Sequence, residues 1–150
     1  MNQDKLMKRR MIIAYILLGI TVIALIVFIG LYIDETQRVQ ETYRKQYRTE
    51  LGHVVEEIDI YSEAEGDRTM IFNRIANYMG NAGAFAFLLE DFEESQIIIN
   101  ETATALIKYP EQMSEKLEDL KTAVNDILAD LDKGYDEAQE IVKSLDLKGY

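Results

Sequence analysis

One histidine and two glutamates lie on the same face of a predicted helix and could bind a metal ion. Glu50, His53 and Glu57 follow one another at spacings of three and four residues, which bring side chains together along a helix. Carboxylate oxygens and an imidazole nitrogen are ligands for zinc and iron. These residue types at this spacing are therefore compatible with a metal site.

Glu50 and His53 form a Glu-x-x-His motif, which resembles half of the carboxylate-bridged di-iron site found in helix bundles. The complete site needs two such motifs, each on its own helix. His53 is the only histidine of the sequence, so the second motif cannot be present. We interpret the group as a surface histidine among glutamates and expect no metal and no other cofactor.

Two acidic runs could attract a cation or a basic partner. Residues 90–94 place Glu90, Asp91, Glu93 and Glu94 close together, but without the alternating spacing and the glycine of a calcium loop. We interpret this run as a solvated helical face. The second run, expected at the membrane-distal tip, suits a basic partner if it has a role. It comprises Glu56, Glu57, Asp59, Glu63, Glu65 and Asp67.

Composition excludes several classes of function. The sequence has no cysteine, so disulfides, thiolate metal sites and cysteine nucleophiles are excluded. The net charge is −11, and from Asp34 onward 12 Lys or Arg stand against 26 Asp or Glu, a difference of −14. Such a surface repels phosphates, so we expect no nucleic acid partner. No nucleophile motif or phosphate-binding loop occurs, and we predict that the protein is not an enzyme.

An uncharged segment near the N-terminus predicts a membrane span. Residues 11–33 contain no charged side chain over 23 positions, which gives about 34 Å of helix against a hydrocarbon core of about 30 Å. The run is too long for a cleaved signal peptide and has no small-x-small site at its end. A buried soluble helix is rarely apolar on every face. We predict an uncleaved signal anchor, with marker residues Met11, Tyr15, Gly19, Phe28, Tyr32 and Ile33.

Basic residues on both sides of this segment bear on its orientation. The tail of residues 1–10 contains Lys5, Lys8, Arg9 and Arg10, while Arg38, Arg44, Lys45 and Arg48 follow the segment. The counts are equal, but the charges of the tail are denser and closer to the apolar core. A long domain also translocates largely regardless of its charge. We predict a cytoplasmic tail and an extracytoplasmic domain over residues 34–150.

Helical periodicity dominates this domain. Apolar residues recur from Tyr43 to Tyr61 without a helix breaker, so we expect the anchor to continue as one helix up to a turn at residues 62–67. Residues 67–108 keep a heptad pattern that predicts one helix, yet Gly80 and Gly83 favour a break. Both alternatives remain open, and with them a count of three or four helices.

Pro110 is predicted to begin the last helix, since proline suits the first helical position. Its heptad seam is interrupted only by Gly134, and its marker residues are Leu117, Leu120, Val124, Ile127, Leu131, Ile141 and Leu145. We interpret the seam as packing within the domain, with self-association or a partner helix as the alternative. The fold prediction is all-α: a transmembrane helix that continues into an antiparallel three- or four-helix bundle or coiled-coil rod.

These features predict a single-pass, membrane-anchored interaction or scaffold protein. It would present its bundle to another envelope protein or to copies of itself, a plan shared by small single-pass components of bacterial division and secretion machines. Alternatively, the layout looks like the front half of four-helix-bundle chemoreceptors, which implies ligand sensing. Those receptors return through a second membrane helix, whereas no second apolar span follows before Tyr150. A sensor of this form is expected to act through a partner.

Overall fold

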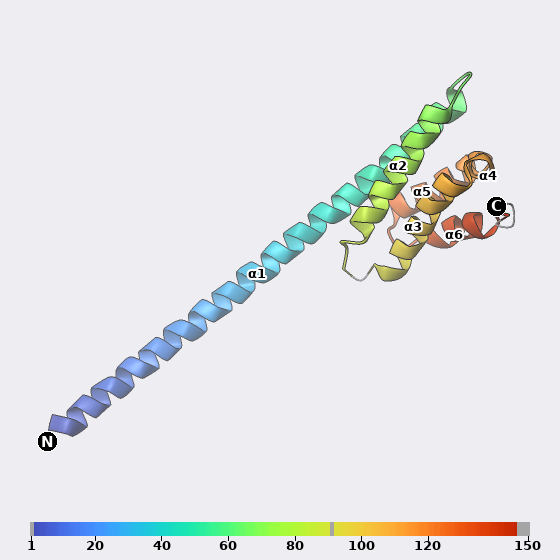
Figure 1. Cartoon of the computed structure of the whole chain (residues 1–150). Coiled ribbons are helices and arrows are strands. Elements are labelled where there is room, and N and C mark those ends of the chain that lie inside the picture. Colours follow the sequence, from blue (N-terminus) through green and yellow to red (C-terminus); the bar gives the residue numbers. More distant parts are fainter. Residues whose placement is uncertain (1, 91, 147–150) are drawn as a thin grey trace. The chain divides into compact units, whose positions relative to one another are not determined.

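In a computed structural model of the chain, all regular structure of the described residues, 2–90 and 92–146, is α-helical (Figure 1). The all-α prediction is confirmed. The chain divides into two units, unit 1 (Met1–Val39) and unit 2 (Gln40–Tyr150). The helices are α1 (Asn2–Glu63), α2 (Thr69–Ala86), α3 (Glu93–Lys108), α4 (Pro110–Ser114), α5 (Leu117–Ala129) and α6 (Tyr135–Lys143).

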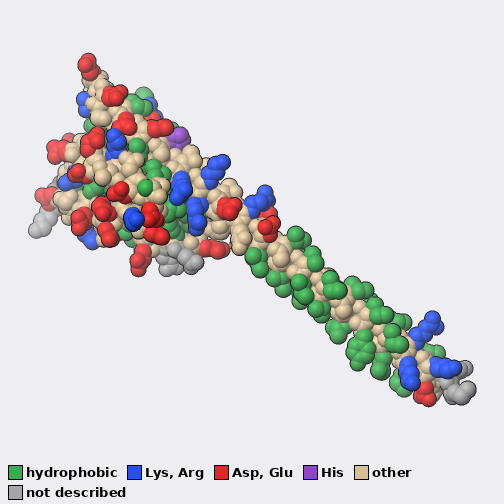
Figure 2. Space-filling model, turned by 180° about the vertical axis from the view of Figure 1, so that it is seen from behind, with side chains coloured by type: hydrophobic (Ala, Val, Ile, Leu, Met, Phe, Trp, Pro, Cys, Tyr) green, Lys and Arg blue, Asp and Glu red, His purple; other side chains and the backbone are tan. Residues whose placement is uncertain are grey.

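Unit 1 is formed by the first part of α1. Every large apolar side chain in residues 11–33 is exposed, with exposed fractions between 47% and 68%. Figure 2 shows these side chains along the visible face of the segment, after a group of Lys and Arg at its N-terminal end. The hydroxyl of Thr21 donates to the carbonyl oxygen of Leu17 at 2.9 Å, so its polar atom is satisfied within the helix. By length and composition, this helix is able to cross a membrane.

The second part of α1 belongs to unit 2 and carries a single buried stripe. Tyr47, Leu51, Val54 and Ile58 are all fully buried, at spacings of four, three and four residues. This is the pattern expected for one helical face packed on a core, and it confirms the stripe predicted from the sequence. Beyond Glu63 the chain turns at Gly66, whose φ of +86° is unfavourable for other residues.

Neither alternative for residues 67–108 is correct: they do not form one helix, and Gly80 and Gly83 do not break it. Both lie inside α2, and the break comes later, between Ala86 and Glu93. A glycine inside a helix costs only about 1 kcal/mol, which packing can offset. Gly83 is buried against Asn100 of α3, where an added Cβ would lie 2.4 Å from the side-chain oxygen. The glycine thus leaves room for the Asn100 side chain where α2 and α3 pack on each other.

The single helix predicted after Pro110 is wrong, because three helices replace it. Pro110 does begin α4, but the chain leaves helical geometry at Lys116, with a φ of −111° and a ψ of 9°, and again from Asp130 to Gly134. Gly134 has a φ of +84°, and an added Cβ would lie 2.3 Å from the carbonyl oxygen of Ala123. This glycine marks a chain reversal rather than a gap in a continuous seam, and α6 packs on α5 and α3.

The residues of the predicted seam lie in the core of unit 2. Leu131 is partly buried, and the other six are buried, with exposed fractions of 8% or less: Leu117, Leu120, Val124, Ile127, Ile141 and Leu145. They come from two helices and the segments that flank them. The apolar side chains of the seam are therefore covered by other residues of unit 2.

A pair of tyrosines joins α1 to α6 inside this core. The hydroxyl groups of Tyr47 and Tyr135 are hydrogen-bonded at 3.0 Å. The ring of Phe92 contacts both rings edge-on, with centroid distances of 5.5 and 5.8 Å. Burial raises the pKa of Tyr135 to about 12 and raises the pKa of Tyr47 further. The pair satisfies two polar groups that would otherwise be costly to bury.

Candidate functional site

The apolar surface of α1 in unit 1 is the most extensive candidate site. Its marker residues Met11, Tyr15, Phe28, Tyr32 and Ile33 have exposed side chains. An added Cβ at Gly19 would meet no atom within 4 Å. The charged side chains of the tail, Lys5, Lys8, Arg9 and Arg10, are exposed as well. The candidate residues follow one another along one helix, so the surface is continuous and is not a pocket.

The group around His53 is engaged in contacts with α2 instead of being arranged as a metal site. Glu50 Oε2 accepts a hydrogen bond from Asn81 Nδ2 at 3.2 Å. The imidazole lies beside the ring of Tyr78, with centroids 4.9 Å apart. Its Nδ1 lies 3.3 Å from Glu56 Oε2. Within the described part of the chain, no group of three or more His, Asp or Glu is placed to hold a metal ion.

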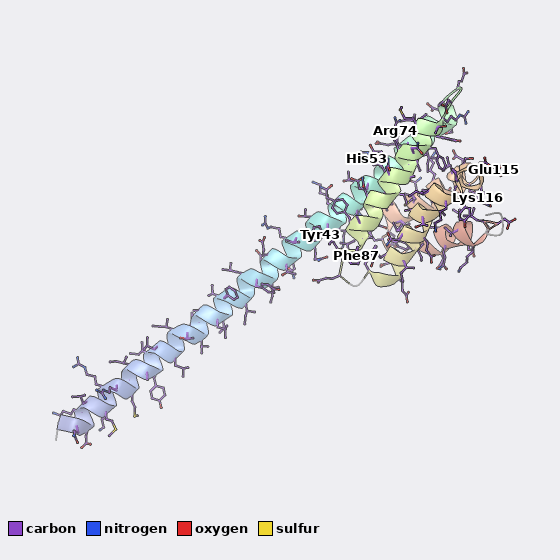
Figure 3. All side chains as sticks on the ribbon, viewed as in Figure 1. Tyr43, His53, Arg74, Phe87, Glu115 and Lys116 are labelled. Carbon is purple, nitrogen blue, oxygen red and sulfur yellow. The ribbon has the colours of Figure 1, made fainter. Side chains whose placement is uncertain are left out.

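Glu57, the third member of the predicted group, forms an ion pair with Arg74 of α2. Arg74 Nη2 donates to Glu57 Oε2 at 2.7 Å, and only 12% of the Glu57 side chain is exposed. The carboxylate raises the pKa of Arg74. Figure 3 shows His53 and Arg74 labelled along the paired stretch of α1 and α2. The contacts of this face therefore hold α1 and α2 together.

Of the two predicted acidic runs, the first is described only in part and the second is described in full. Asp91 and the side chain of Glu93 lie outside the described residues, so the predicted face at residues 90–94 is described only in part. In the second run, Asp59 forms an ion pair with Lys121 of α5. Asp67 accepts a hydrogen bond from the backbone N–H of Thr69 at 2.9 Å, and its pKa is lowered by the hydrogen bonds from Thr69.

A groove of about 500 Å³ opens at the end of unit 2 where α2 and α4 begin. The guanidinium carbon of Arg68 lies 5.2 Å from the ring centroid of Tyr61, within the range of a cation–π contact. Among the described residues, Arg68 forms no ion pair. Sequence reasoning missed this site because its residues come from separate segments. The lining consists of Tyr61, Gly66, Asp67, Arg68, Thr69, Phe72, Asn73, Pro110, Glu111 and Ser114.

A basic surface lies on the part of α1 that begins unit 2. Arg44, Lys45 and Arg48 line a shallow groove of about 380 Å³ together with Glu41 and Thr49. The three cations are exposed, so solvent screens their mutual repulsion. The groove is suited to an anionic group, because three cations and one acidic residue, Glu41, line it among the residues that the structure describes.

No family model, no curated protein and no solved structure matches this chain. The candidate surfaces among the described residues are the apolar face of unit 1, the Arg68 groove and the basic surface of α1.

Proposed function

We propose that the protein is a single-pass membrane protein that presents an acidic helical bundle to protein partners outside the membrane. One observation carries this proposal: residues 11–33 of α1 carry no charge over 23 positions, and the large apolar side chains on every face of this segment are exposed. Soluble proteins rarely expose a continuous apolar surface of this size. A lipid bilayer is the partner whose chemistry fits it.

The character of unit 2 supports an interaction or scaffold role. Its helices share one core, in which the apolar faces of α5 and α6 are buried. Glu57 and Asp59 are paired with cations of neighbouring helices, as in a structural surface. What remains for partners is a mostly acidic exterior, which favours a basic or polar protein surface. The occupant is another envelope protein or a second copy of the chain.

The orientation places the tail of residues 1–10 in the cytoplasm and unit 2 outside. Because the chain has no cysteine, single cysteines report this cleanly. In intact cells, a membrane-impermeant maleimide should label a Lys133→Cys variant, whose side chain is 72% exposed. The matched control, Lys5→Cys in the tail, should react only after lysis. Labelling of Lys133→Cys only after lysis would place unit 2 in the cytoplasm and contradict the proposed orientation.

The groove at Arg68 favours a second candidate function, ligand sensing through a partner. Arg68 lies over an aromatic ring and forms no ion pair with the carboxylates that the structure describes, an arrangement suited to a small organic anion. A ligand that binds only the folded state at a hundredfold excess over its Kd stabilises it by about 2.7 kcal/mol. A panel of small anions should then raise the melting temperature saturably, and Arg68→Ala should abolish the rise. No saturable shift with any of them would remove this alternative.

A further inference from the structure

The turn between α2 and α3 exposes two consecutive apolar side chains. Phe87 is 71% exposed and Leu88 is 42% exposed, while the next residue, Leu89, is buried in the core. The backbone here is well ordered by hydrogen bonds, from Phe87 N–H to Gly83 O at 3.1 Å and from Leu88 N–H to Phe85 O at 3.0 Å. The exposure is therefore built into a formed turn and does not arise from fraying of the helix end.

The side chain of Gln40, the first residue of unit 2, forms two hydrogen bonds with the backbone of this turn. Its Nε2 donates to the carbonyl oxygen of Leu88 at 3.1 Å, and its Oε1 accepts from the backbone N–H of Glu90 at 3.1 Å. Figure 3 shows Tyr43 and Phe87 labelled at the end of unit 2 where α2 finishes. Two hydrogen bonds from one amide side chain thus hold the exposed pair beside the start of this unit.

Chain connectivity limits the distance between Gln40 and the end of the apolar segment. Seven residue steps lead from Ile33 to Gln40, all within α1. They rise about 10 Å as a helix, and could span at most about 25 Å if fully extended. Polar headgroups add roughly 5 to 8 Å on each side of the hydrocarbon core. This limit holds for every direction that unit 2 takes from the apolar segment.

We propose that Phe87 and Leu88 insert into the interfacial region of the same bilayer that residues 11–33 span. The α2–α3 turn is then a second membrane contact, and this inference rests on the proposed membrane span. An aromatic ring beside an aliphatic side chain suits the boundary between headgroups and acyl chains. With two attachment points, unit 2 has a fixed tilt, which decides which of its faces stay open to a protein partner.

Charged side chains of unit 2 have opposite effects on the binding of anionic lipid. Arg44, Lys45 and Arg48 are exposed on the same part of α1 and attract lipid phosphates. Glu90 and Glu94 are exposed next to the turn and repel anionic headgroups. The apolar pair, which binds independently of charge, is therefore the primary contact. We expect insertion into zwitterionic vesicles without any requirement for anionic lipid.

Tryptophan fluorescence tests this contact directly, because the chain has no native tryptophan. Three full-length variants, Phe87→Trp, Phe28→Trp and Ile107→Trp, are reconstituted in phosphatidylcholine vesicles with brominated acyl chains, which quench nearby tryptophan. Ile107 is the matched control, because it is 70% exposed and lies about 20 Å along α3 from the turn. Leu88→Trp is a second reporter of the turn. Thermal unfolding verifies that each variant is folded.

The proposal predicts loss of fluorescence and a blue shift for Phe28→Trp and for both turn variants, with neither change for Ile107→Trp. If Phe28→Trp is quenched but both turn variants behave like Ile107→Trp, the turn does not touch lipid and the inference is overturned. Equal quenching of Ile107→Trp overturns it too, since contact would not be specific to the turn. An unquenched Phe28→Trp contradicts the membrane span itself and so separates failure of the proposed function from failure of this inference.

Discussion

Within the single helix α1, residues 11–33 and residues 47–58 differ in the distribution and the exposure of their apolar side chains. The first stretch has large apolar side chains on all sides, and every one of them is exposed. The second stretch has four fully buried side chains on one face, while polar and charged side chains occupy much of the rest. Both stretches are helical and rich in apolar residues, yet only the second has large apolar side chains buried in a core.

The difference shows that the distribution of apolar residues, rather than their number, indicates the surroundings of a helix. A stripe needs a protein core on one side and water on the other. An apolar surface on every side has no face suited to water and is typical of a helix that spans a membrane. The transition falls where charges return, at Asp34, Glu35 and Arg38.

An arginine introduced into each stretch should affect a different process: folding of unit 2 in residues 47–58, and membrane insertion in residues 11–33. Val54→Arg places an unpaired charge at a fully buried position of unit 2 and is expected to cost about 4 kcal/mol or more. Circular dichroism should show loss of cooperative unfolding, with the protein still in the membrane fraction. Leu25→Arg should instead cost about 3 kcal/mol of insertion and leave unit 2 folded. The comparison fails if Leu25→Arg destabilises unit 2 or if Val54→Arg leaves its melting temperature unchanged.

Two glycines sharpen the contrast. In unit 2, Gly134→Ala forces a side chain into a left-handed residue and against the carbonyl oxygen of Ala123. We expect a loss of about 2 to 3 kcal/mol in the free energy of unfolding, measured in urea. The control, Gly19→Ala in the apolar stretch, meets no atom within 4 Å and should leave that free energy unchanged. Equal effects of the two changes would mean that the packing around Gly134 is not as described.

Alkaline pH should weaken the buried stretch through its tyrosine pair. The folded-state pKa of Tyr135 is raised from 10.0 to about 12 by burial. Its neutral form therefore stabilises the fold fully below pH 10, and this contribution falls as the pH rises toward 12. The slope expected from Tyr135 alone is about 1.4 kcal/mol per pH unit, and the raised pKa of Tyr47 acts in the same direction.

A Tyr135→Phe variant supplies the control for this titration. It should be less stable by about 1 kcal/mol at pH 8, because the hydroxyl of Tyr47 loses its partner. The difference from the unchanged protein should shrink between pH 10 and 12. A difference that stays constant over this range would show that Tyr135 is not buried in the folded state.

Charges on the exposed side of the second stretch should matter least. Lys121→Ala removes the ion pair with Asp59, which is half exposed, and should lower the free energy of unfolding by about 0.5 kcal/mol. High salt should remove most of this difference. A loss above about 2 kcal/mol would mean that charge pairing, and not the buried stripe, holds residues 47–58 to the other helices of unit 2.

The sequence allowed the type of most elements to be predicted but not where the chain folds back. The stripe from Tyr47 to Ile58 and the helix start at Pro110 could be predicted because they depend on local periodicity and local sterics. The reversal at Gly134 could not, since a heptad pattern continues in phase through a turn that brings its two halves together. Gly83 gave a false break signal, because its role in α2 depends on Asn100, which is distant in sequence. The groove at Arg68 was missed for the same reason.

Hydrogen exchange of the full chain in lipid vesicles tests the central contrast most directly. Urea is added to a concentration that unfolds unit 2, and amide protection is followed by mass spectrometry in peptides from both stretches of α1. We predict that residues 47–58 lose protection with the rest of unit 2, whereas residues 11–33 stay protected, because urea does not dissolve the bilayer that shields them. Loss of protection in both stretches at the same urea concentration would contradict a membrane-embedded segment and indicate one soluble fold.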